Sequence, residues 1–417
     1  MEGCDLMSTN KTVIIEELRN SQIPVVLCGA GIVGELLLNI CSEEGITVDC
    51  VCDNSEKVAG SMFHGLEVIL TREFKEKYDD ALFLISVAAI RDAVELLQNQ
   101  GFTRWFAGGV LLEGFDISQN NPDASLDYTR FAVENCIICH HGYLNPDKLF
   151  LRSVDLIITE RCSLKCRDCS NLMQYYVKPQ DCDLSTLLKS VDRLFTIVDE
   201  IMDFRIIGGD AFMNREWPEI VKRVRYEPKA KRVVLYTNGT IVPDDDSLET
   251  LRGDKTLVII TDYGVLSRNL APLKIQLKRM GIAYHVLQIA EWLDCAGITP
   301  HDRTAAQNRQ LYRSCCAKNM LTLSNGRLFR CPYSANAARL AAVPDYHSDY
   351  IDLFQELDDG TGIQVTRDKL RDFLSNLDYL LTCDFCSGRP LSGIELLPAI
   401  QSQDSLPYRN YSVNPFG

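Results

Sequence analysis

Apolar and polar residues alternate along the first part of the chain in a repeating strand-and-helix pattern. The apolar run "IPVVLC" at residues 23–28 leads through closely spaced glycines into a helical pattern, and "ITVDCVCDN" at 46–54 follows as a second strand. The stretches "DALFLISVAAIRDAVELLQNQG" and "FTRWFAGGV" continue the alternation to about residue 112. Strands that alternate with helices are typical of α/β folds, so the pattern predicts an α/β domain over residues 1–118.

The hydrophobic pattern changes after this domain. Residues 119–150 begin with polar and turn-forming residues, as in "DISQNNPDASLDY", which predicts a linker. Buried-strand patterns then recur in "SVDLIIT", "FRIIGGD", "KRVVLYTNGT" and "KTLVIITDYG", and they predict a second α/β domain over residues 151–310. Residues 391–417 are predicted to form an extended C-terminal tail.

Composition narrows the classes of function. The 417 residues carry a formal net charge of −14, with 57 acidic and 43 basic side chains, so the chain has no general attraction to nucleic acid or anionic membranes. No segment approaches the roughly 20 apolar residues that span a bilayer, and the N-terminus lacks a signal pattern, which predicts a cytoplasmic protein. Thiols stay reduced there, so the 17 cysteines are expected to be metal ligands, reactive thiols or buried apolar residues.

Glycines follow the first strand at the spacing of phosphate-binding turns. Gly29, Gly31 and Gly34 connect strand to helix, and Asp53 ends the second strand, where an acidic group can meet a ribose hydroxyl. Glycine lets the backbone approach a pyrophosphate, although the same residues would also serve only to tighten the turn. The segment "DNSEKVAGSMFHGLEVI" resembles the Rossmann-like N-terminal domain of bacterial sugar-modifying acyltransferases, over residues 20–115. The resemblance implies contact with a nucleotide-sugar.

The predicted linker contains a possible metal half-site. The stretch "ENCIICHHGY" carries Cys136, Cys139, His140 and His141. The Cys-x-x-Cys-His spacing matches covalent haem attachment, which we reject for a cytoplasmic protein, and no second pair of ligands at zinc spacing lies nearby. We therefore expect buried thiols beside surface imidazoles.

Three cysteines follow the first strand of the second domain. Cys162, Cys166 and Cys169 in "TERCSLKCRDCS" offer one thiolate fewer than a closed zinc site, whereas a 4Fe-4S cluster held by three cysteines keeps one iron open. This spacing resembles the radical S-adenosylmethionine superfamily. The resemblance implies a partial (β/α)6 barrel of TIM type over residues 151–310 and a cluster whose open iron binds S-adenosylmethionine. Cleavage of this cofactor yields a 5'-deoxyadenosyl radical that abstracts hydrogen from carbon.

The ends of the later strands agree with this resemblance. Gly208, Gly209 and Asp210 stand where the family has Gly-Gly-Glu, which meets the methionine amino group of the cofactor through backbone carbonyls. The family's contacts with the cofactor carboxylate and ribose fall on strand-end residues, here Asn238, Thr261 and Asp262. Asp168 departs from the family, which has an aromatic residue before the third cysteine, so the adenine contact is expected from elsewhere.

A second set of cysteines lies toward the C-terminus. It comprises Cys316, Cys331, Cys383 and Cys386, and the "SNG" turn between the first two supplies the residues that a hairpin needs at positive φ. The spacing resembles the twitch form of the SPASM-like accessory domain of radical enzymes, which implies one auxiliary 4Fe-4S cluster over residues 311–390. Cys315 is an alternative to Cys316, and a four-thiolate zinc site is an alternative to the cluster.

The resemblances together imply an enzyme that oxidises, epimerises, deaminates or dehydrates a carbohydrate or nucleotide-sugar, with an external electron donor such as flavodoxin or ferredoxin. A peptide maturase is the alternative enzyme, and a non-enzymatic iron-sulfur electron carrier is an alternative of another class. Cys295 belongs to neither cysteine set. Because an S–H bond is weaker than most C–H bonds, Cys295 is a candidate hydrogen donor to a substrate radical, with a buried apolar role as its alternative.

Overall fold

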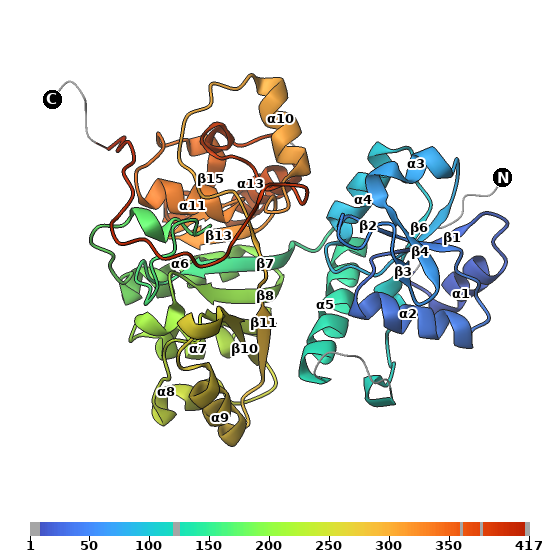
Figure 1. Ribbon diagram of the computed structural model, residues 1–417, viewed down its shortest axis with the longest axis horizontal. Helices are drawn as coiled ribbons and strands as arrows, with labels where there is room; N and C mark the ends of the chain where they lie inside the picture. The colour runs from blue at the N-terminus through green and yellow to red at the C-terminus, as the bar shows by residue number, and fades with distance from the viewer. Residues whose placement is uncertain (1–8, 120–125, 359–361, 376–377, 413–417) are drawn as a thin grey trace. The chain divides into compact units, whose positions relative to one another are not determined.

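The chain divides into two compact units, Met1–Arg152 and Ser153–Gly417, each of which is described by itself (Figure 1). The computed structural model describes residues 9–119, 126–358, 362–375 and 378–412. Both units are mixed α/β structures with mainly parallel sheets. Over these described ranges, no helix has both the length and the apolar character required to cross a bilayer.

The first unit is built on a six-stranded sheet of order β3-β4-β2-β1-β5-β6. The strands from β4 to β6 are parallel, in the order of doubly wound sheets, which bind ligands where the strand order reverses, here between β1 and β5. Apolar side chains from the strands and helices form one core. The elements are β1 Val25–Cys28, β2 Cys50–Asp53, β3 Met62–Phe63, β4 Leu66–Leu70, β5 Leu82–Ile85, β6 Trp105–Ala107, α1 Lys11–Arg19, α2 Ile32–Glu43, α3 Phe74–Lys77 and α4 Ile90–Asn99.

The segment predicted as a linker contains a helix. Helix α5 spans Leu126–Leu144 and contacts α2 and α4, which makes it part of the first unit. The prediction of a linker over residues 119–150 is therefore wrong for this segment; residues 120–125, where the turn-forming residues gather, lie outside the described residues. The error has a simple cause: the prediction extended the polar, turn-forming stretch at residues 116–128 over the helix that follows it.

The burial of the cysteines in α5 agrees with the prediction, but the burial of His140 does not. Cys136 and Cys139 are buried as expected, but His140 is fully buried instead of lying at the surface. Its Nδ1 accepts the Gly109 N–H at 2.9 Å and its Nε2 donates to the Val87 carbonyl at 2.9 Å. Burial lowers the pKa of His140 to about 4, so the ring is a neutral link between backbone groups.

The second unit contains an eight-stranded sheet of order β11-β10-β9-β8-β7-β13-β14-β15. Strands β8 to β11 are parallel. Runs of buried apolar residues lie along β8, β9 and β10, whereas the residues of β11 are only partly buried or exposed. The strands are β7 Phe150–Ile157, β8 Glu200–Ile207, β9 Ala230–Thr237, β10 Thr256–Asp262, β11 Tyr284–Gln288, β12 Trp292–Leu293, β13 Leu321–Ser324, β14 Arg327–Phe329, β15 Tyr350–Asp352 and β16 Glu395–Leu396. The helices are α6 Leu184–Ile197, α7 Trp217–Arg225, α8 Asp245–Glu249, α9 Leu270–Met280, α10 Ala305–Ser314, α11 Pro332–Arg339, α12 Leu353–Asp358 and α13 Ile363–Ser375.

The region predicted as a separate cluster domain extends the sheet of the predicted barrel. Strand β13 pairs in parallel with β7, so it adds a strand next to the consecutive series from β7 to β11 (Figure 1). The β13–β14 hairpin turns at Asn325 and Gly326, whose φ values of 48° and 77° are those of a two-residue hairpin turn and confirm the expected positive φ. A Cβ on Gly326 would also lie 2.6 Å from the Phe354 ring.

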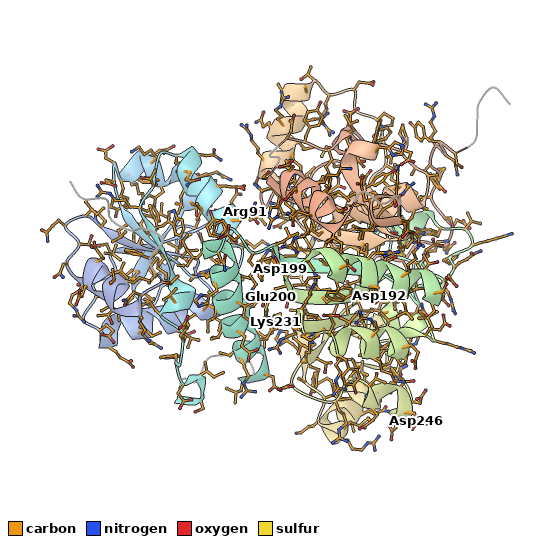
Figure 2. The ribbon with its side chains drawn as sticks, turned by 180° about the vertical axis from the view of Figure 1, so that it is seen from behind. Arg91, Asp192, Asp199, Glu200, Lys231 and Asp246 are labelled. Atoms are coloured by element: carbon orange, nitrogen blue, oxygen red, sulfur yellow. The ribbon has the colours of Figure 1, made fainter. Side chains whose placement is uncertain are left out.

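Ion pairs connect elements at the N-terminal edge of the parallel strands. Glu200, at the start of β8, pairs with Lys231 of β9 at 2.8 Å, and Asp199 pairs with Arg367 of α13 at 2.6 Å (Figure 2). Such partly exposed pairs each contribute about 0–1 kcal/mol, so they align the strands more than they stabilise the fold. The opposite, C-terminal edge carries the residues discussed next.

Candidate functional site

The loop that follows β7 brings the three predicted core ligands together. Cys162, Cys166 and Cys169 all belong to one apolar cluster, whose buried members include Leu164 and Ala399. Cys166 is only 6% exposed. Because the loop leaves the C-terminal end of a parallel strand, it lies at the edge where barrel enzymes place their active sites.

Gly208 and Gly209 follow β8 and pack directly against this loop. The Gly209 N–H donates to the Thr159 carbonyl at 3.1 Å. A Cβ on Gly208 would lie 2.4 Å from that oxygen, and a Cβ on Gly209 would lie 2.3 Å from the Arg161 oxygen and 2.8 Å from the Cys162 Cβ. Only glycine lets the end of β8 approach the cysteine loop this closely.

The Asp210 carboxylate is buried and makes its hydrogen bonds within the fold. It accepts the Phe212 N–H at 3.0 Å, the Asn238 N–H at 2.9 Å and the Thr237 hydroxyl at 2.9 Å. Burial raises the pKa of Asp210, and these donors oppose the rise. The Asp210 side chain therefore joins the segments that follow β8 and β9, and the contact of the Gly-Gly-Asp segment with the cofactor through backbone carbonyls stays a prediction.

Asn238 connects the end of β9 to the cysteine loop. Its Nδ2 donates to the Cys162 Sγ at 3.5 Å and to the Ser163 hydroxyl at 3.2 Å, while its Oδ1 accepts the Thr240 hydroxyl at 2.6 Å. Its backbone carbonyl accepts the Ser267 hydroxyl at 2.7 Å. The side-chain amide is thereby held against a cysteine sulfur, where an N–H donor stabilises a thiolate.

Thr261 and Asp262 end the next strand, β10, as predicted from the sequence. The Asp262 carboxylate accepts the Gly264 N–H at 2.8 Å and the Gln288 side-chain amide at 2.9 Å. Both residues are partly exposed at this edge of the sheet. They therefore remain accessible to a bound molecule in a way that Asp210 does not.

Two aromatic residues beside the cysteines were missed by the sequence analysis. Tyr263 and Trp292 pack against the apolar cluster that contains the three cysteines, with their ring centroids 5.7 Å apart in an edge-to-face arrangement. Burial, and then the neighbouring thiols, raises the pKa of Tyr263, which stays a neutral phenol. The position of Tyr263 directly after a strand-end aspartate was the available signal.

The loop offers three thiols as possible ligands. Burial raises the pKa of all three thiols, to about 11 for Cys166, so thiolates form there only when a cation binds. Within the described part of the chain, no group of three or more His, Cys, Asp and Glu side chains has the spacing for one metal ion. Thiolates that bind different irons of a cluster stand farther apart than the ligands of one ion.

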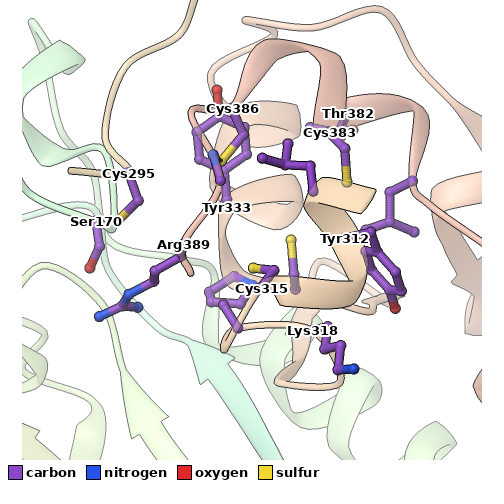
Figure 3. A pocket seen from close by; sticks show the side chains of 16 residues that line it. Ser170, Cys295, Tyr312, Cys315, Lys318, Tyr333, Thr382, Cys383, Cys386 and Arg389 are labelled. Carbon is purple, nitrogen blue, oxygen red and sulfur yellow. Dashed lines mark hydrogen bonds between the residues drawn. The ribbon is translucent and has the colours of Figure 1, made fainter. Parts of the chain in front are cut away.

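Four cysteines line a pocket in the C-terminal part of the second unit: Cys315, Cys331, Cys383 and Cys386 (Figure 3). Two backbone N–H groups point at their sulfurs, with Ser334 donating to Cys331 and Gly388 to Cys386, both at 3.3 Å. Cys331 also caps the N-terminus of α11, where the helix dipole favours a thiolate.

The structure places Cys315, and not the predicted Cys316, in this pocket. Helix α10 ends at Ser314, and Cys315 follows in an extended conformation, so consecutive side chains point in opposite directions. Cys316 is exposed, and its N–H donates to the Arg389 carbonyl at 2.9 Å. The spacing to the hairpin favoured Cys316 in the sequence, with its neighbour Cys315 as the alternative.

Cys295 lies beside the second cysteine set. It is 6% exposed and lines the same pocket as Cys315, together with Ser170, which follows Cys169 in the sequence (Figure 3). Burial raises the pKa of Cys295 to about 11, against the opposing effect of Arg389. Cys295 is thus a neutral thiol in a pocket that extends from the auxiliary cysteines to Ser170, directly after the last cysteine of the core loop.

The glycines of the first unit have unequal roles. Gly29, with φ of 117°, and Gly34 have no room for a side chain, because a Cβ on Gly34 would lie 2.3 Å from the Gly29 oxygen. A Cβ on Gly31 would meet nothing within 4 Å. Asp53 accepts the Ala30 N–H at 2.9 Å and the Ser55 N–H at 2.8 Å. The turn is therefore tight at two glycines and open at the third.

Comparison with known proteins finds sequence similarity between part of this chain and two curated enzymes. It is 26% identical over 151 residues to a GTP 3',8-cyclase of Syntrophomonas wolfei, covering 29% of this chain and 44% of the relative. It is 24% identical over 155 residues to a GTP 3',8-cyclase of Clostridium acetobutylicum, covering 30% and 47%. The chain thus spans less than half the length of these relatives. No family model matches the chain.

Solved structures show weaker likeness. BtrN in complex with AdoMet and 2-DOIA is 14% identical, with a TM-score of 0.36 over 57% of this chain and 93% of that one. Native anSMEcpe with bound AdoMet and Cp18Cys peptide is 19% identical, with a TM-score of 0.28 over 34% and 44%. The similarity to the two cyclases supports the radical S-adenosylmethionine superfamily for this chain.

Proposed function

We propose that this protein is a radical S-adenosylmethionine enzyme that acts on a carbohydrate or nucleotide-sugar. The observation that carries the proposal is the convergence of the three-cysteine loop, the Gly208–Gly209 pair and Asn238 at one edge of a parallel sheet. When bound, the cluster and its S-adenosylmethionine supply an electron and then a 5'-deoxyadenosyl radical that removes hydrogen from a substrate carbon. The second candidate enzyme, a peptide maturase, would use the same chemistry on a peptide.

Different residues around the loop are proposed to bind the cluster, to contact the cofactor and to position the backbone. Cys162, Cys166 and Cys169 would hold the core cluster, and the backbone at Gly208 and Gly209, which packs against their loop, would meet the cofactor's amino group. The strand-end residues Asn238, Thr261 and Asp262 contact its carboxylate and ribose. Asp210 acts as a positioning residue, because its carboxylate accepts the N–H groups of Phe212 and Asn238, which follow β8 and β9.

The aromatic pair of Tyr263 and Trp292 takes the role that Asp168 cannot perform. A purine base packs favourably on an aromatic face, and these two rings lie in the same cluster as the three cysteines. They also keep water away from the loop. We therefore assign the adenine contact to this pair.

Cys315, Cys331, Cys383 and Cys386 hold one auxiliary 4Fe-4S cluster, with Cys315 in place of Cys316. The amide donors at Cys331 and Cys386 and the helix N-terminus favour thiolates there. An auxiliary cluster close to the substrate would accept an electron from a substrate radical. An external flavodoxin or ferredoxin in the cytoplasm would supply the electron for the core cluster.

The first unit is the reason for preferring a nucleotide-sugar. Its strand order, reversing between β1 and β5, and its open position at Gly31 suit a pyrophosphate at the N-terminus of α2. A peptide would need none of these features. Binding of UDP- and TDP-sugars against short peptides, measured by calorimetry, separates the two enzymes: saturable binding of a peptide alone would favour the maturase.

The test of the chemistry is S-adenosylmethionine cleavage by anaerobically reconstituted, reduced protein. Replacement of Cys162, Cys166 and Cys169 by alanine should remove about half of the iron and all production of 5'-deoxyadenosine. The matched control is Cys182→Ala, which removes a buried thiol of the same unit that bonds to the Ile157 carbonyl. Cleavage that survives in the triple variant would refute the proposed function.

A further inference from the structure

The predicted C-terminal tail crosses the cysteine loop and is bonded to it (Figure 1). We call residues 399–402 the strap. The Arg167 N–H donates to the Ile400 carbonyl at 2.7 Å, and the Ser402 N–H donates to the Lys165 carbonyl at 2.6 Å. These two bonds flank Cys166, which is paired with Gln401 as an isolated bridge. The strap therefore makes a short two-stranded contact with the middle of the predicted ligand loop.

The side-chain amide of Gln401 is fully used in this contact. Its Oε1 accepts the Lys165 N–H at 2.9 Å, and its Nε2 donates to the Ala399 carbonyl at 2.8 Å and to the Cys166 Sγ at 3.3 Å. Since a backbone N–H can only donate and a carbonyl can only accept, these partners determine which end of the amide faces the sulfur. Gln401 therefore presents an N–H to Cys166.

Two features of Ala399 also indicate that the strap is held in a defined conformation. Ala399 is 3% exposed and packs with Leu164 and Cys166 in one apolar cluster. Its φ is 56°, a left-handed conformation that costs a residue with a side chain about 1 kcal/mol and persists only where surrounding contacts enforce it. Upstream, β16 pairs with β12, so the strap is also anchored beside Trp292.

We propose that the strap is part of the core cluster site and that Gln401 is a positioning residue that sets the reduction potential of the cluster. An N–H donated to a ligand sulfur withdraws negative charge and stabilises the reduced, more negative state of the cluster, so the potential rises. With Asn238 against Cys162, side-chain amides face two of the three ligand sulfurs. The inference rests on the proposed function, because it assumes that Cys166 binds the cluster.

The experiment compares three variants of the full-length, reconstituted protein: Gln401→Leu, Gln401→Glu and Gln403→Glu. Gln403 is the matched control, since it lies two residues along the same segment, is exposed, and has no hydrogen bond among the described residues. The readout is the midpoint potential of the cluster whose electron paramagnetic resonance signal changes when S-adenosylmethionine is added. Iron content and melting temperature are measured on the same samples.

Gln401→Leu should shift this potential to more negative values, and Gln401→Glu should shift it further, because a carboxylate adds charge where a donor was lost. Gln403→Glu should keep the native potential, although it carries the same added charge. Iron lost only from the Gln401 variants, at an unchanged melting temperature, would also place Gln401 at the site. Native potentials and iron contents in both Gln401 variants would overturn the inference. A native protein without any signal that responds to S-adenosylmethionine would instead refute the proposed function.

Discussion

Replacing Gly209 by alanine tests the contact between β8 and the cysteine loop. The added Cβ would lie 2.3 Å from the Arg161 oxygen and 2.8 Å from the Cys162 Cβ, whereas ordinary contact begins at 3.4 Å. The Arg161 carbonyl must therefore move by about 1 Å and Cys162 by about half as much. Overpacking of this kind costs about 1–3 kcal/mol, and a displacement of about 1 Å at a reacting centre lowers a rate about 10²-fold.

The assay is production of 5'-deoxyadenosine from S-adenosylmethionine by reduced protein, with melting measured on the same preparation. We expect Gly209→Ala to reduce cleavage about 10²-fold while the protein still folds. Gly297→Ala is the control in the same unit, because its new Cβ would meet only the Ser387 hydroxyl, at 3.8 Å. A Gly209→Ala protein with native cleavage and native melting would show that the end of β8 does not position the cysteine loop.

Four further predictions concern other parts of the chain. Cys315→Ala should lose about four of the eight irons expected from two clusters, whereas Cys316→Ala should keep them all; iron analysis decides, and equal iron in the two variants would remove Cys315 from the ligand set. Burial lowers the pKa of His140 from 6.5 to about 4, so protonation favours the unfolded state. The stability that the neutral ring contributes to the folded protein is therefore complete above pH 6.5 and is lost as the pH falls toward 4. That loss amounts to about 2 kcal/mol at pH 5, and urea unfolding of His140→Asn, which should lack this pH dependence, measures it. Gly31→Glu should abolish nucleotide-sugar binding without unfolding the protein, because the position is open, and S-adenosylmethionine cleavage should persist; loss of both would contradict separate roles for the units. Cys295→Ala, assayed with the substrate in deuterated water, should stall an epimerase that uses this thiol as hydrogen donor, and normal turnover would rule the thiol out.

Features that depend on neighbours in the sequence could be predicted well. The spacing of Cys162, Cys166 and Cys169 and the turn at Gly326 appear in the structure as expected, because a loop or a tight turn is governed by a few adjacent residues. The strand-end position of Thr261 was likewise predictable, since buried strands are marked by continuous apolar runs. Helix α5 shows the limit of this reasoning, because the polar stretch before it led to the prediction of a linker across the helix as well.

What the sequence alone determined is which residue types stand at strand ends and at cluster spacing along the chain. The tertiary structure decided which of them meet. A change of one residue reverses the direction of a side chain after α10, so only the fold could choose Cys315 over Cys316. Gln401 lies 235 residues from the sulfur that it contacts, and no local pattern encodes such a distance. Asp210 follows a strand as its place in the sequence indicated, but only the fold brings its buried carboxylate to the Asn238 N–H, 28 residues along the chain. Each of these contacts depends on the packing of segments that are far apart in the sequence.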